Sequence, residues 1–124
     1  KAHWKLADIY TDLKQPSLAV EHYRQGIQLE PNLAVHHYNL GNLLNHASEY
    51  DEAITCYRRA IELKNDYLEA HVNLGSVYFK MERYAEAVTE FEHALQINPN
   101  FAPARQNLER VQTLLQRPSS RSRP

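Results

Sequence analysis

The sequence repeats itself at a constant interval of 34 residues, as from Leu6 to Leu40 and Leu74, and no other feature restricts the fold as strongly. Small or apolar side chains recur at this interval in three successive copies, without insertion or deletion: Leu6, Leu40 and Leu74; Ala19, Ala53 and Ala87; Tyr23, Tyr57 and Phe91. A unit of this length is too small to bury its apolar face alone, so it stacks on the next unit. The chain is therefore expected to form a row of like units instead of a closed bundle.

Each repeat is predicted to contain two α-helices, because apolar residues recur at helical spacing in two segments. The first helices are expected near 2–14, 34–47 and 68–81, and the second helices near 17–30, 51–64 and 85–98. Pro31 and Pro99 mark two of the breaks between repeats, since proline cannot continue a helix. A small residue such as Gly41 is expected where two helices cross, with the ring of Tyr57 filling the space beside it.

A fourth copy begins at residue 102 and ends without a second helix. Leu108 stands in register with Leu74, and polar residues such as Arg105 and Glu109 occupy its outer side. A terminal helix with a polar face shields a stacked core from water, so this segment is expected to be a cap. We predict an all-α, right-handed superhelical solenoid with repeats over 1–33, 34–67 and 68–101, a capping helix over 102–116 and a disordered basic tail over 117–124.

The third repeat contains a set of residues that is typical of a known family: Leu74, Gly75, Tyr78, Ala87, Phe91, Ala94 and Pro99. This pattern resembles the tetratricopeptide repeat family, and the resemblance covers nearly all of residues 1–116. It implies helix-turn-helix repeats that bind a peptide or protein partner. The departures are mild: Ala7 replaces a Gly, Gly26 an Ala, Asn65 a Pro, and His3, His37 and His71 replace a Trp, whose packing role we expect them to take.

The resemblance also implies a concave ligand groove lined by the first helix of each repeat. The positions carried over are Trp4, Lys5, Asp8, Tyr38, Asn39, Asn42, Val72, Asn73, Ser76, Phe79 and Asn107, with Lys80 and Arg110 beside them. The apolar anchors for a ligand would be Trp4, Tyr38, Val72 and Phe79.

Asparagine recurs in this set at Asn39, Asn73 and Asn107. An Asn amide both donates and accepts, so it can pair with a peptide unit whatever that peptide's side chains are. Three such residues would be similar to the asparagine ladder in the repeats of O-linked N-acetylglucosamine transferase, although Lys5 interrupts the series. The alternative is that Asn is an ordinary residue at this position and hydrates the helix surface.

Members of the family that bind the acidic C-termini of heat-shock chaperones use a clamp of cations and asparagines. In one register the cation positions of this clamp hold Trp4, Glu69 and Asn73, and in the next they hold Tyr38, Pro103 and Asn107. A buried carboxylate without a cation is poorly held. The carboxylate clamp is therefore expected to be absent.

Neither a metal site nor a catalytic site is expected. The histidines that recur from repeat to repeat project in parallel, whereas the ligands of a zinc ion must converge on one point. Cys56 stands beside the expected core residue Tyr57 without a His–Asp pattern and is interpreted as a small hydrophobe. The sequence also lacks a phosphate-binding loop and a nucleophile motif. We therefore expect a non-enzymatic chain without a cofactor.

Charge and hydropathy restrict the partners. The net charge is −1, and the three arginines of the tail leave −4 for residues 1–116, so no nucleic-acid partner is expected. No apolar run approaches the roughly 18 residues of a membrane span, so no direct membrane contact is expected. The single cysteine is compatible with a reducing compartment, and the cytoplasm is the default location.

These observations predict a scaffold segment that binds a peptide or protein in its groove. The alternative is a non-catalytic, substrate-recruiting repeat region of a larger enzyme such as a glycosyltransferase. The chain begins Lys1-Ala2-His3-Trp4, without Met or a helix-capping residue, so we expect it to be a piece of a longer protein. An exposed Trp4 on this uncapped first helix would also permit self-association.

Overall fold

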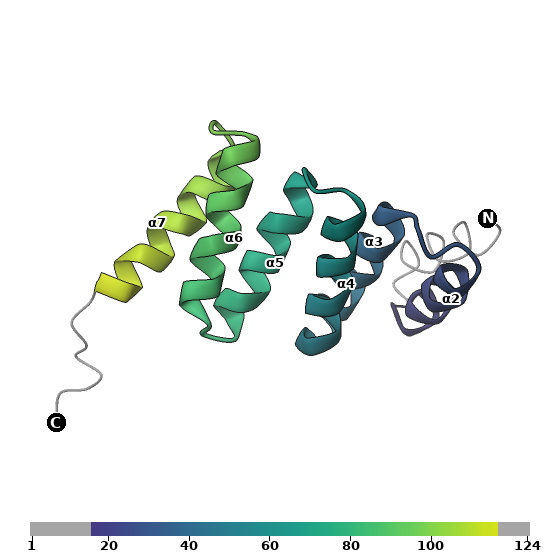
Figure 1. Ribbon diagram of the computed structural model, residues 1–124. Coiled ribbons are helices and arrows are strands. Elements are labelled where there is room, and N and C mark those ends of the chain that lie inside the picture. Colours follow the sequence, from purple (N-terminus) through teal and green to yellow (C-terminus); the bar gives the residue numbers. More distant parts are fainter. Residues whose placement is uncertain (1–15, 117–124) are drawn as a thin grey trace, which may run out of the picture.

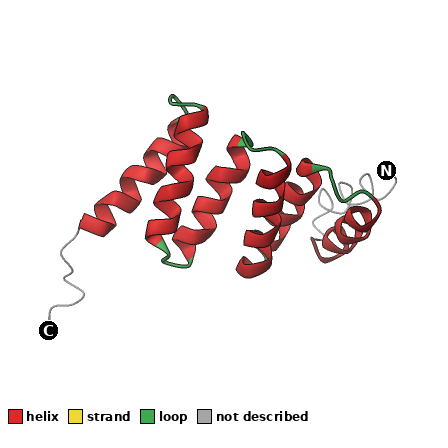
Figure 2. Cartoon of the chain, viewed as in Figure 1, coloured by secondary structure: helices red, strands yellow, loops and turns green. Residues whose placement is uncertain are grey.

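The computed structural model describes residues 16–116, and in this range the chain forms a row of α-helices without a strand (Figures 1 and 2). The helices are α2 (Pro16–Leu29), α3 (Ala34–His46), α4 (Tyr50–Leu63), α5 (Leu68–Lys80), α6 (Tyr84–Ile97) and α7 (Ala102–Gln116). Each of these helices begins and ends within one residue of its expected range, and the predicted all-α repeat solenoid is confirmed. Predictions that concern residues 1–15 and 117–124 lie outside the described residues.

Successive helices pack against one another along the row (Figure 1). In addition, α5 contacts both α3 and α7, which are its counterparts in the preceding and following repeats. The helices α3, α5 and α7 therefore share one side of the row, here called the inner side. The helices α4 and α6 form the outer side.

The turn between the two helices has the same conformation in the second and third repeats. Ser48 and Glu82 both have a φ of 61°, in the left-handed region that non-glycine residues rarely adopt. After α3, the Glu49 N–H donates to the Leu44 carbonyl at 2.8 Å, and after α5 the Arg83 N–H donates to the Tyr78 carbonyl at 2.8 Å. These bonds satisfy the last carbonyls of each helix and reverse the chain into the next helix.

The close approach within each pair of helices depends on a glycine. A Cβ atom added to Gly41 would lie 2.8 Å from Cε1 of Tyr57, and one added to Gly75 would lie 2.6 Å from Cε1 of Phe91. Tyr57 is 0% exposed and Phe91 is 1% exposed, so neither ring has room to move aside. The expected contact between Gly41 and Tyr57 is therefore present, and it recurs in the third repeat.

The apolar core runs through the whole row. Buried residues of every helix from α2 to α7 belong to one cluster, from Ala19 and Tyr23 at one end to Ala104 and Val111 at the other. His37 and His71 are also buried, which agrees with the packing role expected for them. Continuous burial of this kind is what stacked repeats achieve and a single repeat cannot.

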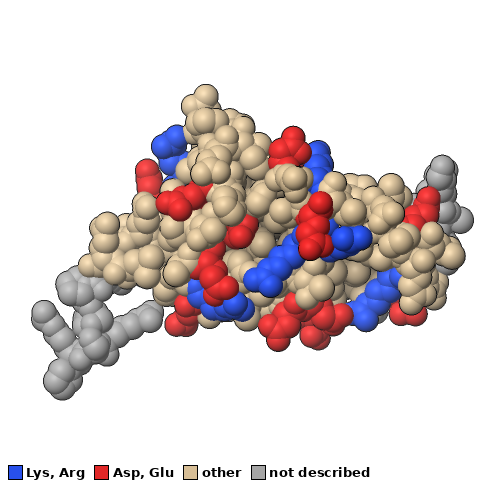
Figure 3. Space-filling view, viewed as in Figure 1, with Lys and Arg blue, Asp and Glu red and all other residues tan. Residues whose placement is uncertain are grey.

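The surface in Figure 3 has no large patch of one charge, because its acidic and basic side chains are interspersed. Among residues 16–116, no helix combines the length and the apolar character that crossing a bilayer requires.

Candidate functional site

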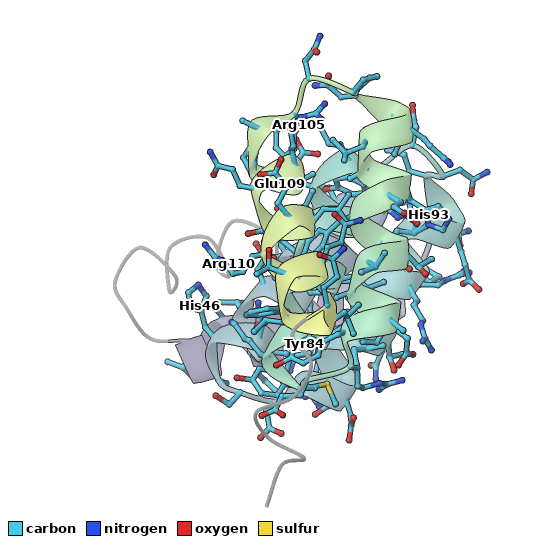
Figure 4. All side chains as sticks on the ribbon, turned by 90° about the vertical axis from the view of Figure 1, so that its left-hand side faces the viewer. His46, Tyr84, His93, Arg105, Glu109 and Arg110 are labelled. Atoms are coloured by element: carbon cyan, nitrogen blue, oxygen red, sulfur yellow. The ribbon has the colours of Figure 1, made fainter. Side chains whose placement is uncertain are left out.

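The inner side is the candidate binding surface. Figure 4 shows the array end-on, looking along the row of helices. His46 at the end of α3 and Arg110 of α7 both lie on one side of the array, and His93 of α6 lies on the opposite side. Two neighbouring environments occupy the inner side. One lies between α3 and α5, and the other lies between α5 and α7.

Between α3 and α5 the polar side chains bond to one another. The Asn73 amide donates to the hydroxyl of Tyr38 at 3.1 Å and to Oδ1 of Asn42 at 2.9 Å. The same Oδ1 of Asn42 accepts a hydrogen bond from the hydroxyl of Tyr57. We call these four residues the Tyr–Asn network.

The Tyr–Asn network uses several of its polar groups internally, which leaves fewer of them for a ligand to bond. Both amide hydrogens of Asn73 and the acceptor of Asn42 are in use, and an amide nitrogen has only two hydrogens to donate. Burial raises the pKa of Tyr57, so its hydroxyl stays protonated and remains a donor. The ring of Tyr38 also packs 4.9 Å from that of Tyr67, between ring centroids. The network therefore acts mainly as an internal connection between repeats.

Between α5 and α7 the structure is open. A hollow of about 260 Å³ lies here, and we call it the α5–α7 pocket; its lining residues are Ser76, Phe79, Lys80, Phe91, Asn107 and Arg110. The buried ring of Phe91 forms the floor, and the ring of Phe79 stands 5.6 Å from that of Tyr84, between centroids. This combination provides an apolar base with polar groups around it.

The polar groups of the α5–α7 pocket are largely available. The side chains of Asn107 and Arg110 form no hydrogen bond or ion pair with any residue between 16 and 116. Lys80 is exposed; its Nζ donates to Oδ1 of Asn45 at 2.9 Å and lies 5.8 Å from the centroid of the Tyr50 ring. No carboxylate lines the pocket, so its two cations favour an acidic group.

The two environments occupy the same register positions in successive repeats. Val72 stands where the Tyr–Asn network has Tyr38, Ser76 where it has Asn42, Phe91 where it has Tyr57, and Asn107 where it has Asn73. Val72 and Phe91 lack a hydroxyl, and Ser76 donates to the carbonyl of Val72 in its own helix at 3.1 Å. Asn107 is thus left without the partners that Asn73 has.

The residues expected in the groove therefore separate into groups. Tyr38, Asn42 and Asn73 come together in the Tyr–Asn network, and Ser76, Phe79 and Asn107 come together in the α5–α7 pocket, with Lys80 and Arg110. Asn39 is half-buried and has no hydrogen-bond partner among residues 16–116. The positions Trp4, Lys5 and Asp8 lie outside the described residues.

Val72 does not suit the role of a ligand anchor that the sequence suggested for it. It is 8% exposed and belongs to the core cluster, so a ligand could touch little of its side chain. From the sequence, Tyr57 and Phe91 are expected only in the core. The sequence does contain a signal for their different roles: the position has Tyr57 in the second repeat and Phe91 in the third, and only Tyr57 has a hydroxyl that can reach the inner side.

On the outer side, Cys56 is unsuited to act as a nucleophile. Burial raises its pKa to about 11, and the charge of Glu52 adds to this increase while Arg24 opposes it. A thiol with so high a pKa stays protonated at neutral pH, and only the thiolate is an effective nucleophile. Three side chains between α5 and α6, those of His71, Glu90 and His93, lie close enough together to share a metal ion.

Comparison with family models gives two matches. A model described as TPR repeat matches residues 7–45 and 41–82, and a model described as tetratricopeptide repeat matches residues 68–101. Together the matches span more than half of the chain. No curated protein matches the sequence.

Solved structures with a similar fold include MamA and two TPR domains. MamA superposes with a TM-score of 0.88 at 29% identity, over 91% of this chain and 66% of the MamA chain. The first TPR of Spaghetti (RPAP3), bound to the HSP90 peptide SRMEEVD, gives 0.87 at 20% identity, over 92% of this chain and 90% of the other. The second TPR domain of human RPAP3, in complex with the HSP70 peptide SGPTIEEVD, gives 0.84 at 22% identity, over 89% and 92%. At such low identities the last two likenesses concern the fold alone.

Proposed function

Because the chain belongs to the tetratricopeptide repeat family, we propose that it is a protein-interaction scaffold whose α5–α7 pocket binds an acidic segment of a partner. The observation that supports this most directly is the pair of cations, Lys80 and Arg110, at a hollow that no carboxylate lines. The chain would supply a binding surface and no chemistry of its own.

The chemistry of the pocket indicates what kind of segment fits. Arg110 can bond a carboxylate with two parallel N–H groups, and Lys80 adds a second positive charge. Asn107 has an amide free to pair with the backbone of the bound segment. The half-buried ring of Phe79 presents apolar surface to the hollow, above the buried ring of Phe91. The ligand is therefore an extended segment that places an acidic side chain next to an apolar one.

This mode of binding differs from a clamp on a terminal carboxylate. Among the described residues, the cation positions of the clamp hold Glu69 and Asn73 in one register and Tyr38, Pro103 and Asn107 in the next, and none of these is a cation. Asn42 and Asn73 are also engaged with each other. The cations of this protein stand at other positions, so the carboxylate that they bind belongs to a Glu or Asp side chain.

A peptide titration tests the proposal. The probe is a short peptide in which glutamates flank one leucine, amidated at its C-terminus so that it has no terminal carboxylate. We expect it to bind the intact chain, with an affinity that falls as salt concentration rises. The same peptide with lysine in place of glutamate is expected not to bind.

Charge reversal locates the binding site. The double variant Lys80→Glu/Arg110→Glu should weaken binding at least about tenfold, which corresponds to about 1.4 kcal/mol. The control, Lys64→Glu/Arg105→Glu, changes the net charge equally at positions outside the pocket and should leave affinity nearly unchanged. Equal losses in the two variants, or binding that requires a free terminal carboxylate, would contradict the proposal. Circular dichroism melting of both variants checks that they fold.

Two further hypotheses from the sequence stay as predictions. Recruitment of substrate for a larger enzyme such as a glycosyltransferase is compatible with the same pocket, and it depends on what else the parent protein contains. Self-association through the first helix depends on Trp4, which lies outside the described residues.

A further inference from the structure

A second cluster of polar side chains lies between α5 and α6, away from the α5–α7 pocket. His71 projects from α5, and Glu90 and His93 project from α6. Nδ1 of His71 is 2.9 Å from Oε1 of Glu90, and Nδ1 of His93 is 3.8 Å from the same oxygen. One donor atom from each residue lies within 4.8 Å of the other two. In Figure 4, His93 lies on the side of the array opposite to Arg110.

The orientation of the His71 ring is set by the backbone. Nε2 of His71 is 3.1 Å from the carbonyl oxygen of Asn65, so this nitrogen must carry a hydrogen and donate it. The lone pair of the neutral ring is then on Nδ1 and faces the carboxylate of Glu90. Two electron-rich atoms at this distance need a cation between them, either a proton or a metal ion. A ring held by a backbone carbonyl in this way is the usual arrangement for histidines that bind metal.

The third residue and the surrounding space favour a metal ion. A proton between His71 and Glu90 requires no further ligand, yet His93 brings another nitrogen to the same oxygen. Ligands bound to zinc at about 2.0–2.1 Å in tetrahedral geometry stand roughly 3.3 Å from one another. The side chain of His93 is 47% exposed and is therefore free to close the remaining distance.

A hollow beside the cluster leaves room for a fourth ligand. It has a volume of about 310 Å³, and its lining includes His71, His93 and Gln96. A water molecule, the amide of Gln96 or a group from a partner could complete the coordination from this hollow.

The second repeat shows what the third has gained. His37 is the counterpart of His71 one repeat earlier, and its Nε2 is also held by a carbonyl, that of Pro31 at 2.8 Å. The positions equivalent to Glu90 and His93 hold Cys56 and Arg59. Arg59 is a fixed cation paired with Glu62 at 3.2 Å, so it cannot serve as a ligand. Both repeats therefore have a histidine at this position, but only in the third repeat do a carboxylate and a second imidazole lie beside it.

We propose that His71, Glu90 and His93 form a binding site for a divalent transition-metal ion, with zinc as the best fit. Two nitrogens and a carboxylate oxygen are ligands that zinc accepts. The ion would join α5 to α6 and leave the α5–α7 pocket untouched. The proposal is independent of the acidic ligand proposed for the α5–α7 pocket.

The test titrates the purified chain, freed of metal by a chelator, with zinc in a calorimeter and with cobalt in a spectrophotometer. We expect one zinc ion per chain, a visible absorption band for the cobalt form, and a rise in Tm with zinc concentration because the ion binds the folded state. The variant His93→Ala removes one ligand, and Glu90→Gln replaces the carboxylate by a neutral amide, which is a much weaker ligand; neither position is fully buried. Each should weaken zinc binding by at least about tenfold.

His46→Ala serves as the control, since His46 is an exposed histidine at the end of α3. It should leave zinc affinity and the Tm rise unchanged. The proposal is overturned if the intact chain does not bind zinc, in which case a proton joins His71 to Glu90. It is equally overturned if His93→Ala and Glu90→Gln bind zinc as well as the intact chain does.

Discussion

The two environments on the inner side are made at the same register positions, yet one is closed and the other is open. In the Tyr–Asn network, Asn73 bonds to Tyr38 and Asn42, and Tyr57 completes the set from beneath. In the α5–α7 pocket, Asn107 has no partner among the described residues. The difference arises from the residues around the asparagine and not from the asparagine itself.

This comparison shows how a repeat protein can separate stability from recognition. Buried polar groups must be bonded, so a repeat whose neighbours supply both donors and acceptors connects its helices and offers little to a ligand. In the third repeat, Phe91 stands at the position of Tyr57 and Ser76 at that of Asn42. These two differences remove the internal hydrogen-bond partners but keep an aromatic ring packed on the glycine. The backbone arrangement is preserved, and the polar groups become available.

The largest expected effects come from deleting the two equivalent rings. Phe91→Ala should lower the free energy of unfolding by about 3–5 kcal/mol, as expected for a buried ring. Tyr57→Ala should cost about 1 kcal/mol more, because Asn42 also loses a hydrogen-bond donor. Urea denaturation with equal m-values measures both. A larger loss for Phe91→Ala would contradict the distinction between a closed and an open environment.

Removing only the hydroxyl of Tyr57 isolates the polar part of the difference. Tyr57→Phe keeps the ring against Gly41 but leaves Asn42 with one donor fewer, and should cost about 1–2 kcal/mol of stability. The midpoint of urea denaturation reports this. An unchanged midpoint would indicate that the Tyr–Asn network contributes nothing to holding the repeats together.

Rebuilding the network in the open environment is the converse experiment. The double variant Ser76→Asn/Phe91→Tyr places beside Asn107 the same two side chains, an Asn and a Tyr, that Asn42 and Tyr57 place beside Asn73. It should weaken binding of the glutamate peptide by about tenfold, or about 1.4 kcal/mol, because Asn107 and the hollow become occupied internally. Fluorescence anisotropy measures the affinity. Binding as tight as that of the intact chain would show that the openness of the pocket is irrelevant to recognition.

The smallest expected effect concerns Asn107. Asn107→Ala should change stability by no more than about 0.5 kcal/mol, since its side chain bonds to no described residue. Asn73→Ala should cost about 1 kcal/mol, because it removes two hydrogen bonds. Thermal denaturation of the two variants side by side decides this. Equal losses would remove the contrast between the two asparagines.

Much of the fold could be predicted from the sequence, because the constant interval between repeats and the helical spacing depend only on local pattern. The contact of Tyr57 with Gly41 follows from that register. Which asparagine side chains bond within the protein could not be predicted, since Asn39, Asn73 and Asn107 occupy equivalent positions in the repeat. Their environments differ through side chains of other helices.

The proximity of His71, Glu90 and His93 could not be predicted for a related reason. The sequence draws attention to His37 and His71, which recur between repeats and point in parallel. The structure instead brings His71 to Glu90 and His93, which lie in the second helix of the same repeat. Convergence of this kind depends on how two helices pack, and periodicity between repeats does not report it.

The most direct test of the account follows the side-chain amides of Asn73 and Asn107 by nuclear magnetic resonance during titration with the glutamate peptide. The amide resonances of Asn107 and the guanidinium resonances of Arg110 should move as the peptide binds, and the amide resonances of Asn73 should stay in place. If Asn73 moves and Asn107 does not, the ligand binds across the Tyr–Asn network, and the division of the inner side described above is wrong.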